Sequence, residues 1–192
     1  MRFEEASDYI LTKLRGELPV TLHYHSVEHT LGVYEAAKRL ATLENIDDYE
    51  MRLILTAACY HDTGFLTRAD GHELISCEIT RKTLPGYGYN PAEIDQICGM
   101  IMATRLPQTP KNYLEEILAD ADLDYLGRDD FFLWSNKLNL EMKDLGKTSA
   151  ADWNRVQIDF LEKHHYFTKS AQNLRLKKKA KHLEELKAKL KN

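Results

Sequence analysis

The sequence predicts an all-α fold, and three observations support this prediction. Apolar residues recur with a period of about 3.6 in nearly every segment of the 192 residues, which is typical of helices with one buried face. No segment alternates polar and apolar residues over more than a few positions, so strands are not expected. Cap residues, glycines and prolines divide the helical segments, but no low-complexity linker or repeat separates them. We therefore expect a single-domain helical bundle at 1–168 and a basic helical extension at 169–192.

Boundary residues place four helices in the first half of the chain. Ser26 suits the N-cap of the second helix, and Asp47 or Asp48 opens the third. The four helices are expected from Phe3 to a stop at Gly16 and Pro19, from Val27 to about Leu43, from Asp47 or Asp48 to His61, and from Gly71 to Leu84.

The second half begins with a clear helix start. Asn90, Pro91 and Glu93 combine a cap residue, a proline in the first turn and a glutamate three residues past the cap. Further helices are expected from about Leu114 into 120–124, at 131–145, from Ser149 to about Phe167, and from Ser170 onward. One side of the helix that starts at Ser149 is expected to consist of Trp153, Val156, Phe160 and Phe167.

Composition and cysteine usage indicate an ordinary cytoplasmic globular protein. Hydrophobic residues make up 43% of the chain and charged residues 29%. Charged residues in the first twenty positions argue against a signal peptide, and no apolar run reaches the roughly 18 residues of a membrane span. Cys59, Cys77 and Cys98 are odd in number and never form a Cys-x-x-Cys pair. A disulfide framework or zinc ribbon is therefore not expected.

Charge is distributed unevenly along the chain. From Lys169 onward there are nine lysines and arginines and two glutamates, which gives this segment a net charge of +7. Since the whole chain carries −4, residues 1–168 carry −11, and this acidic body disfavours nucleic acid or a membrane as the main partner. The basic segment is expected to be a solvated helix, while a scaffold role in pairing with itself or a partner stays open.

Three places bring metal-ligand residue types onto the predicted helices. His25 and His29 lie four residues apart and can share a helix face. His61 and Asp62 end a buried helix, where unpaired polar groups would be costly. The third place is Asp120-Ala121-Asp122. A single His-Asp pair is most often a capped helix end, but together these places offer two imidazoles and two carboxylates to one ion, with room for water and substrate.

In this order, on an all-helical chain, the sequence resembles the HD-domain superfamily of metal-dependent phosphohydrolases over about residues 20–130. The resemblance implies four metal ligands, His29, His61, Asp62 and Asp122. Asp120 and Asp124 would then face solvent or support a ligand. The segments that carry the resemblance are Tyr24-His25-x-x-x-His29, Ala58-Cys59-Tyr60-His61-Asp62-Thr63-Gly64, and Leu118-Ala119-Asp120-Ala121-Asp122-Leu123-Asp124-Tyr125-Leu126-Gly127.

The first of these segments is also similar to the opening motif of the cyclic-nucleotide phosphodiesterases. That resemblance implies that His25 is the general acid that protonates the leaving oxygen. Asp62, as a ligand of the metal, can also orient the attacking water. An imidazole suits proton transfer near neutral pH. The alternative is that His25 caps or orients a neighbour.

Three further residues are candidates for substrate binding. Arg105 and Arg68 could hold phosphate oxygens, although the favoured interpretation of each is an ordinary surface arginine. His72 could hydrogen-bond near the site or, as in two-metal branches of the superfamily, bind a second ion. Residues 103–105 lack the histidine that those branches often supply, which favours one ion.

The expected activity is hydrolysis of a phosphomonoester or phosphodiester, with a nucleotide-like substrate. The cofactor is one divalent metal ion (Mn, Mg, Fe, Co, Ni or Zn), with a second ion left open. Two alternatives stay open: a di-iron oxygenase on the same scaffold, and a regulatory module that binds a nucleotide or metal without turnover. A homo-oligomer is compatible with the sequence.

Overall fold

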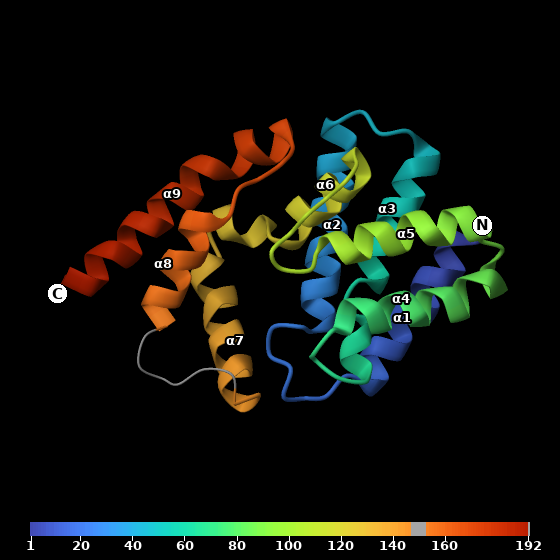
Figure 1. Cartoon of the computed structure of the whole chain (residues 1–192), viewed down its shortest axis with the longest axis horizontal. Helices are drawn as coiled ribbons and strands as arrows, with labels where there is room; N and C mark the ends of the chain where they lie inside the picture. Colours follow the sequence, from blue (N-terminus) through green and yellow to red (C-terminus); the bar gives the residue numbers. More distant parts are fainter. Residues whose placement is uncertain (147–152, 192) are drawn as a thin grey trace. The chain divides into compact units, whose positions relative to one another are not determined.

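The computed structural model describes residues 1–146 and 153–191, and every regular element in these two ranges is helical, with no strand (Figure 1). This confirms the all-α prediction. None of the described helices is long and apolar enough to cross a membrane. The α-helices are α1 (Phe3–Glu17), α2 (Val27–Leu43), α3 (Asp48–Tyr60), α4 (His72–Thr83), α5 (Pro91–Ala103), α6 (Tyr113–Asp122), α7 (Phe131–Asp144), α8 (Trp153–Lys163) and α9 (Lys169–Lys191). Three 3-10 turns accompany them, η1 (Thr63–Leu66), η2 (Leu84–Tyr87) and η3 (Asp124–Gly127).

The chain divides into two compact units. The N-terminal unit consists of Met1–Pro19 and His25–Asp122, and the C-terminal unit consists of Val20–Tyr24 and Leu123–Asn192. The basic helix α9 therefore belongs to a larger unit with η3 and α8, against which it packs. The division into a bundle at 1–168 and an extension at 169–192 stays a prediction.

Helix α3 is the centre of the N-terminal unit. All eight residues from Leu53 to Tyr60 are buried, and α1, α2, α5 and α6 pack around them. An element enclosed in this way is apolar on every side, which explains the continuous apolar run in the sequence. Its C-terminal end delivers His61 and Asp62 into the interior of the unit.

The helix starts follow the predicted caps. The Ser26 hydroxyl accepts a hydrogen bond from the His29 N–H, and the Asp47 carboxylate accepts one from Glu50 N–H at 2.8 Å. Asn90 and Glu93 form a reciprocal capping box at the start of α5, with bonds of 3.0 and 2.7 Å. These caps fix where α2, α3 and α5 begin.

An aromatic and aliphatic cluster forms the core of the C-terminal unit. Its buried members are Tyr24, Leu123, Tyr125, Leu126, Phe131, Trp134, Leu161 and Leu186. Tyr24 packs edge-on against Tyr125 and Trp134, which gives this residue a packing role. The segment Val20–Tyr24 thus supplies a core residue to a unit built mainly from the end of the chain.

The prediction for α8 was wrong at its C-terminal end. The helix ends at Lys163, so Phe167 lies beyond it. Val156, on the side that the sequence indicated, is 48% exposed. Gln157 and Leu161 are the buried positions. The Ser135 hydroxyl donates to the Gln157 side chain and accepts from Trp153 Nε1 at 3.0 Å, and Leu161 belongs to the apolar core of the unit. The predicted start at Ser149 lies outside the described residues.

Acidic side chains of the same unit neutralise much of α9. Arg175 donates two hydrogen bonds to the buried Asp124 carboxylate, at 2.7 and 3.0 Å. Ion pairs also join Lys178 to Asp129 and Lys187 to Glu162. Lys179 is buried and donates to the carbonyl of His164. The positive charge of α9 is therefore partly used within its own unit.

Candidate metal centre

His29 enters the interior of the N-terminal unit in the first turn of α2. Ser26 caps the helix three residues earlier, which fixes the position of this turn. The His29 imidazole is buried, and its Nε2 lies 3.4 Å from Nε2 of His61. Two ring nitrogens from different helices thus point at the same place.

The His61 ring is oriented by its own helix end. Its Nδ1 lies 2.8 Å from the Ala58 carbonyl oxygen, which can only accept, so Nδ1 carries the hydrogen. The neutral ring then presents the lone pair of Nε2 to the interior. A histidine held in this tautomer by a backbone carbonyl is the usual form of a metal-binding imidazole.

Two carboxylates complete the group of side chains. Asp62 Oδ2 lies 3.1 Å from His61 Nε2 and 3.4 Å from His29 Nε2. Asp122, the last residue of α6, places Oδ1 at 3.2 Å from His29 Nε2 and 3.6 Å from His61 Nε2. We refer to His29, His61, Asp62 and Asp122 as the four-residue cluster.

The donor set and spacing of the four-residue cluster fit a divalent ion. Ligand atoms about 2.1 Å from one ion and at right angles to each other lie about 3 Å apart, close to the distances seen here. His29, His61 and Asp122 are near enough to one another to hold a metal ion. Within the described part of the chain, buried Asp62 Oδ2 has no hydrogen-bond partner, as expected of an atom that ligates a cation.

The electrostatics of the cluster favour the same cation. Burial alone would lower the pKa of His61, but the Asp62 and Asp122 carboxylates outweigh it and raise this pKa well above 6.5. Burial alone would raise the pKa of Asp122, but hydrogen bonds from His29 and His61 lower it to about 2. Asp62 has a pKa well below its usual range because the neighbouring imidazoles outweigh its burial. The carboxylates are thus ionised, and positive charge is stabilised between them.

A second layer of rings lies beside the cluster. His25 stacks on Phe65 with ring centroids 3.9 Å apart, and Phe65 contacts His72 at 4.2 Å. The His25 ring lies 6.0 Å from that of His29. The expectation that His25 and His29 share a helix face was wrong, because α2 begins at Val27 and His25 precedes the cap. Stacking on Phe65, and not helical spacing, holds His25 near the cluster.

His72 faces the second oxygen of Asp62. Its Nδ1 lies 3.1 Å from the Ala69 carbonyl, and its Nε2 lies 3.4 Å from Asp62 Oδ1. Glu73 Oε1 is 3.7 Å from the same nitrogen. Burial would lower the pKa of His72, but Asp62 raises it overall. Asp62 therefore contacts imidazoles through both of its oxygens.

Gly64 allows α4 to approach the His-Asp segment. A Cβ atom at this position would lie 2.0 Å from the His72 carbonyl oxygen, far inside contact distance. The Gly64 N–H also donates to the Ser76 hydroxyl at 2.8 Å. The glycine two residues after Asp62 is thus required for the position of His72.

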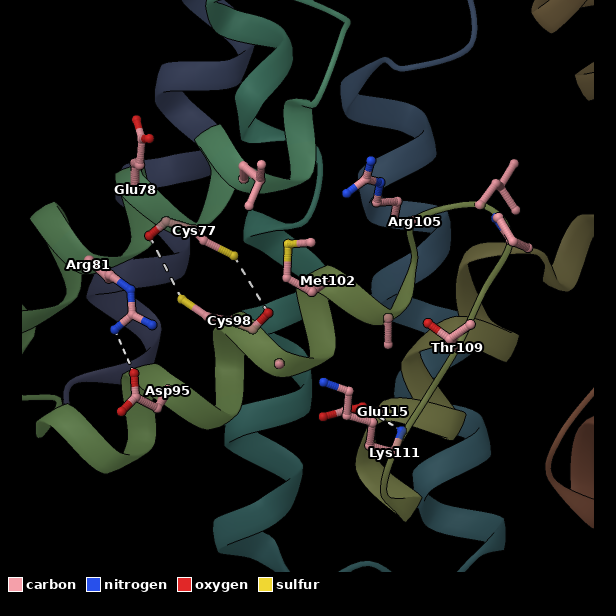
Figure 2. Close-up of a pocket in the computed structure, with 15 residues that line it drawn as sticks. Cys77, Glu78, Arg81, Asp95, Cys98, Met102, Arg105, Thr109, Lys111 and Glu115 are labelled. Carbon is pink, nitrogen blue, oxygen red and sulfur yellow. Dashed lines mark hydrogen bonds and ion pairs between the residues drawn. The ribbon is translucent and has the colours of Figure 1, made fainter.

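The other predicted site residues lie elsewhere. Arg68 is exposed and lines a shallow depression with Ile75 and Lys82, and Arg105 is exposed at the edge of a separate groove (Figure 2). Asp120 and Asp124 are both buried, which excludes the solvent-facing alternative for these two acids. Asp124 is held by Arg175 in the C-terminal unit.

Phe65 is the main residue of the site that the sequence did not indicate. An aromatic residue directly after His61-Asp62-Thr63-Gly64 was the available signal. Its role depends on contacts with residues forty positions before it and seven after it, which no local pattern shows. Glu73, although adjacent to His72 in the sequence, was likewise not identified.

Comparison with known proteins places this geometry in context. The HD domain family matches residues 26–125, which include the four-residue cluster. Among curated protein sequences, none matches the chain.

Three solved structures share the fold. A predicted HD superfamily hydrolase from an uncultured Thermotogales bacterium is 20% identical, with a TM-score of 0.61 over 95% of this chain and 90% of the other. A Lactobacillus plantarum protein is 17% identical, with a TM-score of 0.70 over 100% and 99%. Bacillus subtilis YpgQ, in complex with ADP, is 18% identical, with a TM-score of 0.66 over 100% and 96%.

Proposed function

Because this chain belongs to the HD-domain family, we propose that it is a metal-dependent hydrolase that cleaves a phosphomonoester or phosphodiester bond of a nucleotide-like substrate. The observation that supports this most strongly is the convergence of four ligand atoms from α2, the end of α3 and the end of α6. Structural cores rarely bury two carboxylates and two imidazoles together without a cation.

The four-residue cluster would hold the ion. A divalent metal bound there would polarise a phosphoryl oxygen and lower the pKa of a water molecule. The chain's part is to keep its donors in place: the Ala58 carbonyl orients His61, and the Ser26 cap sets the first turn of α2 that carries His29. Asp62 would also orient the attacking water through the oxygen that faces His72.

His25 is the proposed general acid. Its ring is half-buried and lies near both His29 and His72, with centroids 6.0 and 5.9 Å away. Stacking on Phe65 restricts the plane of the His25 ring beside the cluster. A positioned imidazole can donate a proton to the leaving oxygen, which is worth on the order of 100- to 10,000-fold in rate.

A nucleotide-like substrate is supported by two observations. The B. subtilis neighbour of the same fold is in complex with ADP. In this chain, the rings of His25 and His72 are partly exposed beside the cluster and pack on the buried Phe65. His72 is the proposed substrate-binding residue, or the ligand of a second ion shared with Asp62. Arg68 and Arg105 stay candidates for phosphate contacts, for which Met substitution would raise KM and leave kcat unchanged.

Metal content and turnover should be measured on the same preparations. Chelator-treated protein, reloaded separately with Mn²⁺, Mg²⁺ or Zn²⁺, is incubated with nucleoside mono-, di- and triphosphates and with bis(p-nitrophenyl) phosphate. We expect hydrolysis that is lost on chelation and restored by metal. Asp122→Asn should bind metal about 100-fold more weakly and lose turnover with unchanged circular dichroism. Glu116→Gln, on the same helix but outside the cluster, should behave like the unaltered protein.

The contrary outcomes identify the alternatives. Tight nucleotide binding by metal-loaded protein without hydrolysis would indicate a regulatory module. Oxygen consumption with two bound irons would indicate an oxygenase. Failure to retain any metal would refute the proposed site itself.

A further inference from the structure

Cys77 of α4 and Cys98 of α5 face each other inside the N-terminal unit (Figure 2). The Cys77 thiol donates to the Cys98 carbonyl oxygen at 3.5 Å, and the Cys98 thiol donates to the Cys77 carbonyl oxygen at 3.8 Å. A disulfide requires backbones that approach closely and side chains that point toward each other. The reciprocal contacts of each sulfur with the other residue's carbonyl show that the two backbones lie close and that both side chains reach into the space between α4 and α5.

Both thiols line a groove that opens to solvent. The groove has a volume of about 960 Å³, and its walls come from α4, α5 and the segment after α5. Cys77 is 8% exposed and Cys98 4%, whereas the third cysteine, Cys59 in α3, is fully enclosed at 0%. A small oxidant can therefore reach this pair before it reaches Cys59.

We propose that Cys77 and Cys98 are a reversible dithiol–disulfide site, oxidised by a hydroperoxide that enters the groove between α4 and α5. The pair lies in neither the four-residue cluster nor its ring layer. Arg105 lies at the edge of the same groove, but the test of this proposal measures cysteine oxidation and does not depend on hydrolase activity.

The oxidation balances in two steps. The Cys98 thiolate attacks one peroxide oxygen, the O–O bond breaks, and the leaving oxygen takes a proton as water or an alcohol. The Cys77 sulfur then attacks the resulting sulfenic acid, the S–S bond forms, and the S–O bond breaks with loss of a second water. Two thiols lose two electrons and two protons, which the peroxide accepts.

The surroundings favour Cys98 as the first nucleophile. A hydrogen bond from the Cys77 thiol lowers the pKa of Cys98 despite its burial, and the Arg81 guanidinium acts in the same direction. The same bond, together with burial, raises the pKa of Cys77. Arg81 is held at the groove by Asp95, to which it donates at 2.6 Å (Figure 2). Cys59, in contrast, has its pKa raised to about 12 by burial.

The three cysteines can be followed separately. Trypsin cuts after lysine and arginine, so Cys59, Cys77 and Cys98 fall in different peptides, 53–68, 69–81 and 83–105. The reduced full-length protein is treated with hydrogen peroxide and then unfolded in urea that contains N-ethylmaleimide, which labels the remaining free thiols. It is digested with trypsin and analysed by mass spectrometry without reductant. We expect peptide 69–81 linked to 83–105, lighter by two hydrogen atoms than the two together. Peptide 53–68 should carry the maleimide, and dithiothreitol should restore labelling of all three.

Single variants test the order of attack. In Cys77→Ser, peroxide should leave a sulfenic acid on Cys98 that dimedone traps; in Cys98→Ser, Cys77 should stay reduced under the same conditions. Circular dichroism checks that both variants fold. If either variant does not fold, the mass-spectrometric experiment on the unaltered protein decides the proposal. The proposal is overturned if both peptides of the treated native protein remain fully labelled. It is equally overturned if disulfides of Cys59 are as abundant as the Cys77–Cys98 disulfide. Oxidation of Cys77 and Cys98 to sulfinic acids without a disulfide between them would also overturn it.

Discussion

His25 shows how a single residue can reach a site by a route that its sequence spacing does not suggest. It precedes the first turn of α2, yet its ring lies beside His29 because it stacks on Phe65 of η1. This position leaves the ring free of the metal-ligand set and near the cluster, as a proton donor requires.

Replacing His25 by glutamine should separate proton donation from metal binding. We expect kcat to fall by about 100-fold or more, because the amide cannot donate a proton to the leaving oxygen at neutral pH. Metal content should stay unchanged, since His25 is not among the four ligands. His23→Gln, two residues earlier and paired with Asp144, should leave both quantities unchanged. Loss of metal from His25→Gln would show instead that His25 is a ligand or shapes the ligand set.

Metal affinity should increase with pH. The Asp62 and Asp122 carboxylates outweigh burial and raise the pKa of His61 well above 6.5, so the imidazole of the metal-free protein keeps its proton to higher pH than a free imidazole does. Because the metal requires the neutral imidazole, binding expels this proton, and affinity should change by up to about tenfold per pH unit below the raised pKa. Calorimetric titration with Zn²⁺ in two buffers of different ionisation enthalpy measures the released protons. Equal heats in both buffers would contradict the prediction.

The ligand residue types and their order along the chain were accessible from the sequence, through resemblance to a known superfamily. The structure brings His29, His61, Asp62 and Asp122 together. The ring layer was not accessible, because Phe65 meets His25 only after α2 and η1 have packed. The three acids at 120, 122 and 124 could not be ranked by exposure, since all of them turn inward or pair with distant residues.

At the scale of elements, helix starts were easier to predict than helix ends. The side chains of Ser26, Asp47 and Asn90 accept hydrogen bonds from backbone N–H groups three residues later, so the local sequence is enough to predict these caps. The 3-10 turns span four residues each and leave no period to detect. Helix α8 ends at Lys163 without a glycine or proline to mark the boundary, and this explains the overextended prediction.

Gly64→Ala should destabilise the junction between η1 and α4. The added Cβ would meet the His72 backbone at 2.0 Å, and neither main-chain segment can move without displacing His72 from Asp62. We expect a loss of about 2–3 kcal/mol in the free energy of unfolding, measured by urea denaturation with circular dichroism. Weaker metal binding should accompany it.

The matched control is Gly16→Ala in α1. A Cβ at Gly16 has no heavy atom within 4 Å, and the residue is helical. Alanine there should be neutral or stabilise by up to about 1 kcal/mol. Equal stability of the two variants would show that the approach of α4 to Gly64 is not required.

For the whole molecule, the division into two units was the least accessible feature. The segment Val20–Tyr24 belongs to the unit whose other residues begin at Leu123. No change in amino-acid composition along the sequence indicates that this short segment belongs to the C-terminal unit. Such pairing depends on Tyr24 packing against Tyr125 and Trp134. A useful consequence is that both tryptophans, Trp134 and Trp153, belong to the C-terminal unit, so their fluorescence reports its unfolding alone.

Arg175→Met should destabilise the C-terminal unit. The variant removes the two hydrogen bonds that Arg175 donates to the buried Asp124 carboxylate, which should lower the free energy of unfolding by about 2–4 kcal/mol. This is less than for a fully buried pair, because Arg175 is itself partly exposed. The midpoint of tryptophan fluorescence in urea should fall accordingly. Lys178 lies on the same helix as Arg175 and makes an exposed ion pair with Asp129; Lys178→Met should change the free energy of unfolding by less than about 1 kcal/mol. Similar midpoints for both variants would rule out a structural role for the Arg175 pair.

The ion pairs of α9 also determine how this helix meets polyanions. A segment with a formal charge of +7 would ordinarily gather a loose cloud of small anions, whose release drives adsorption onto a phosphate backbone. Here three of the counter-anions are carboxylates of the same chain, Asp124, Asp129 and Glu162, whose local concentration does not fall on dilution. A nucleic acid would have to compete with these carboxylates, so we expect the helix to bind polyanions more weakly than its lysine content suggests.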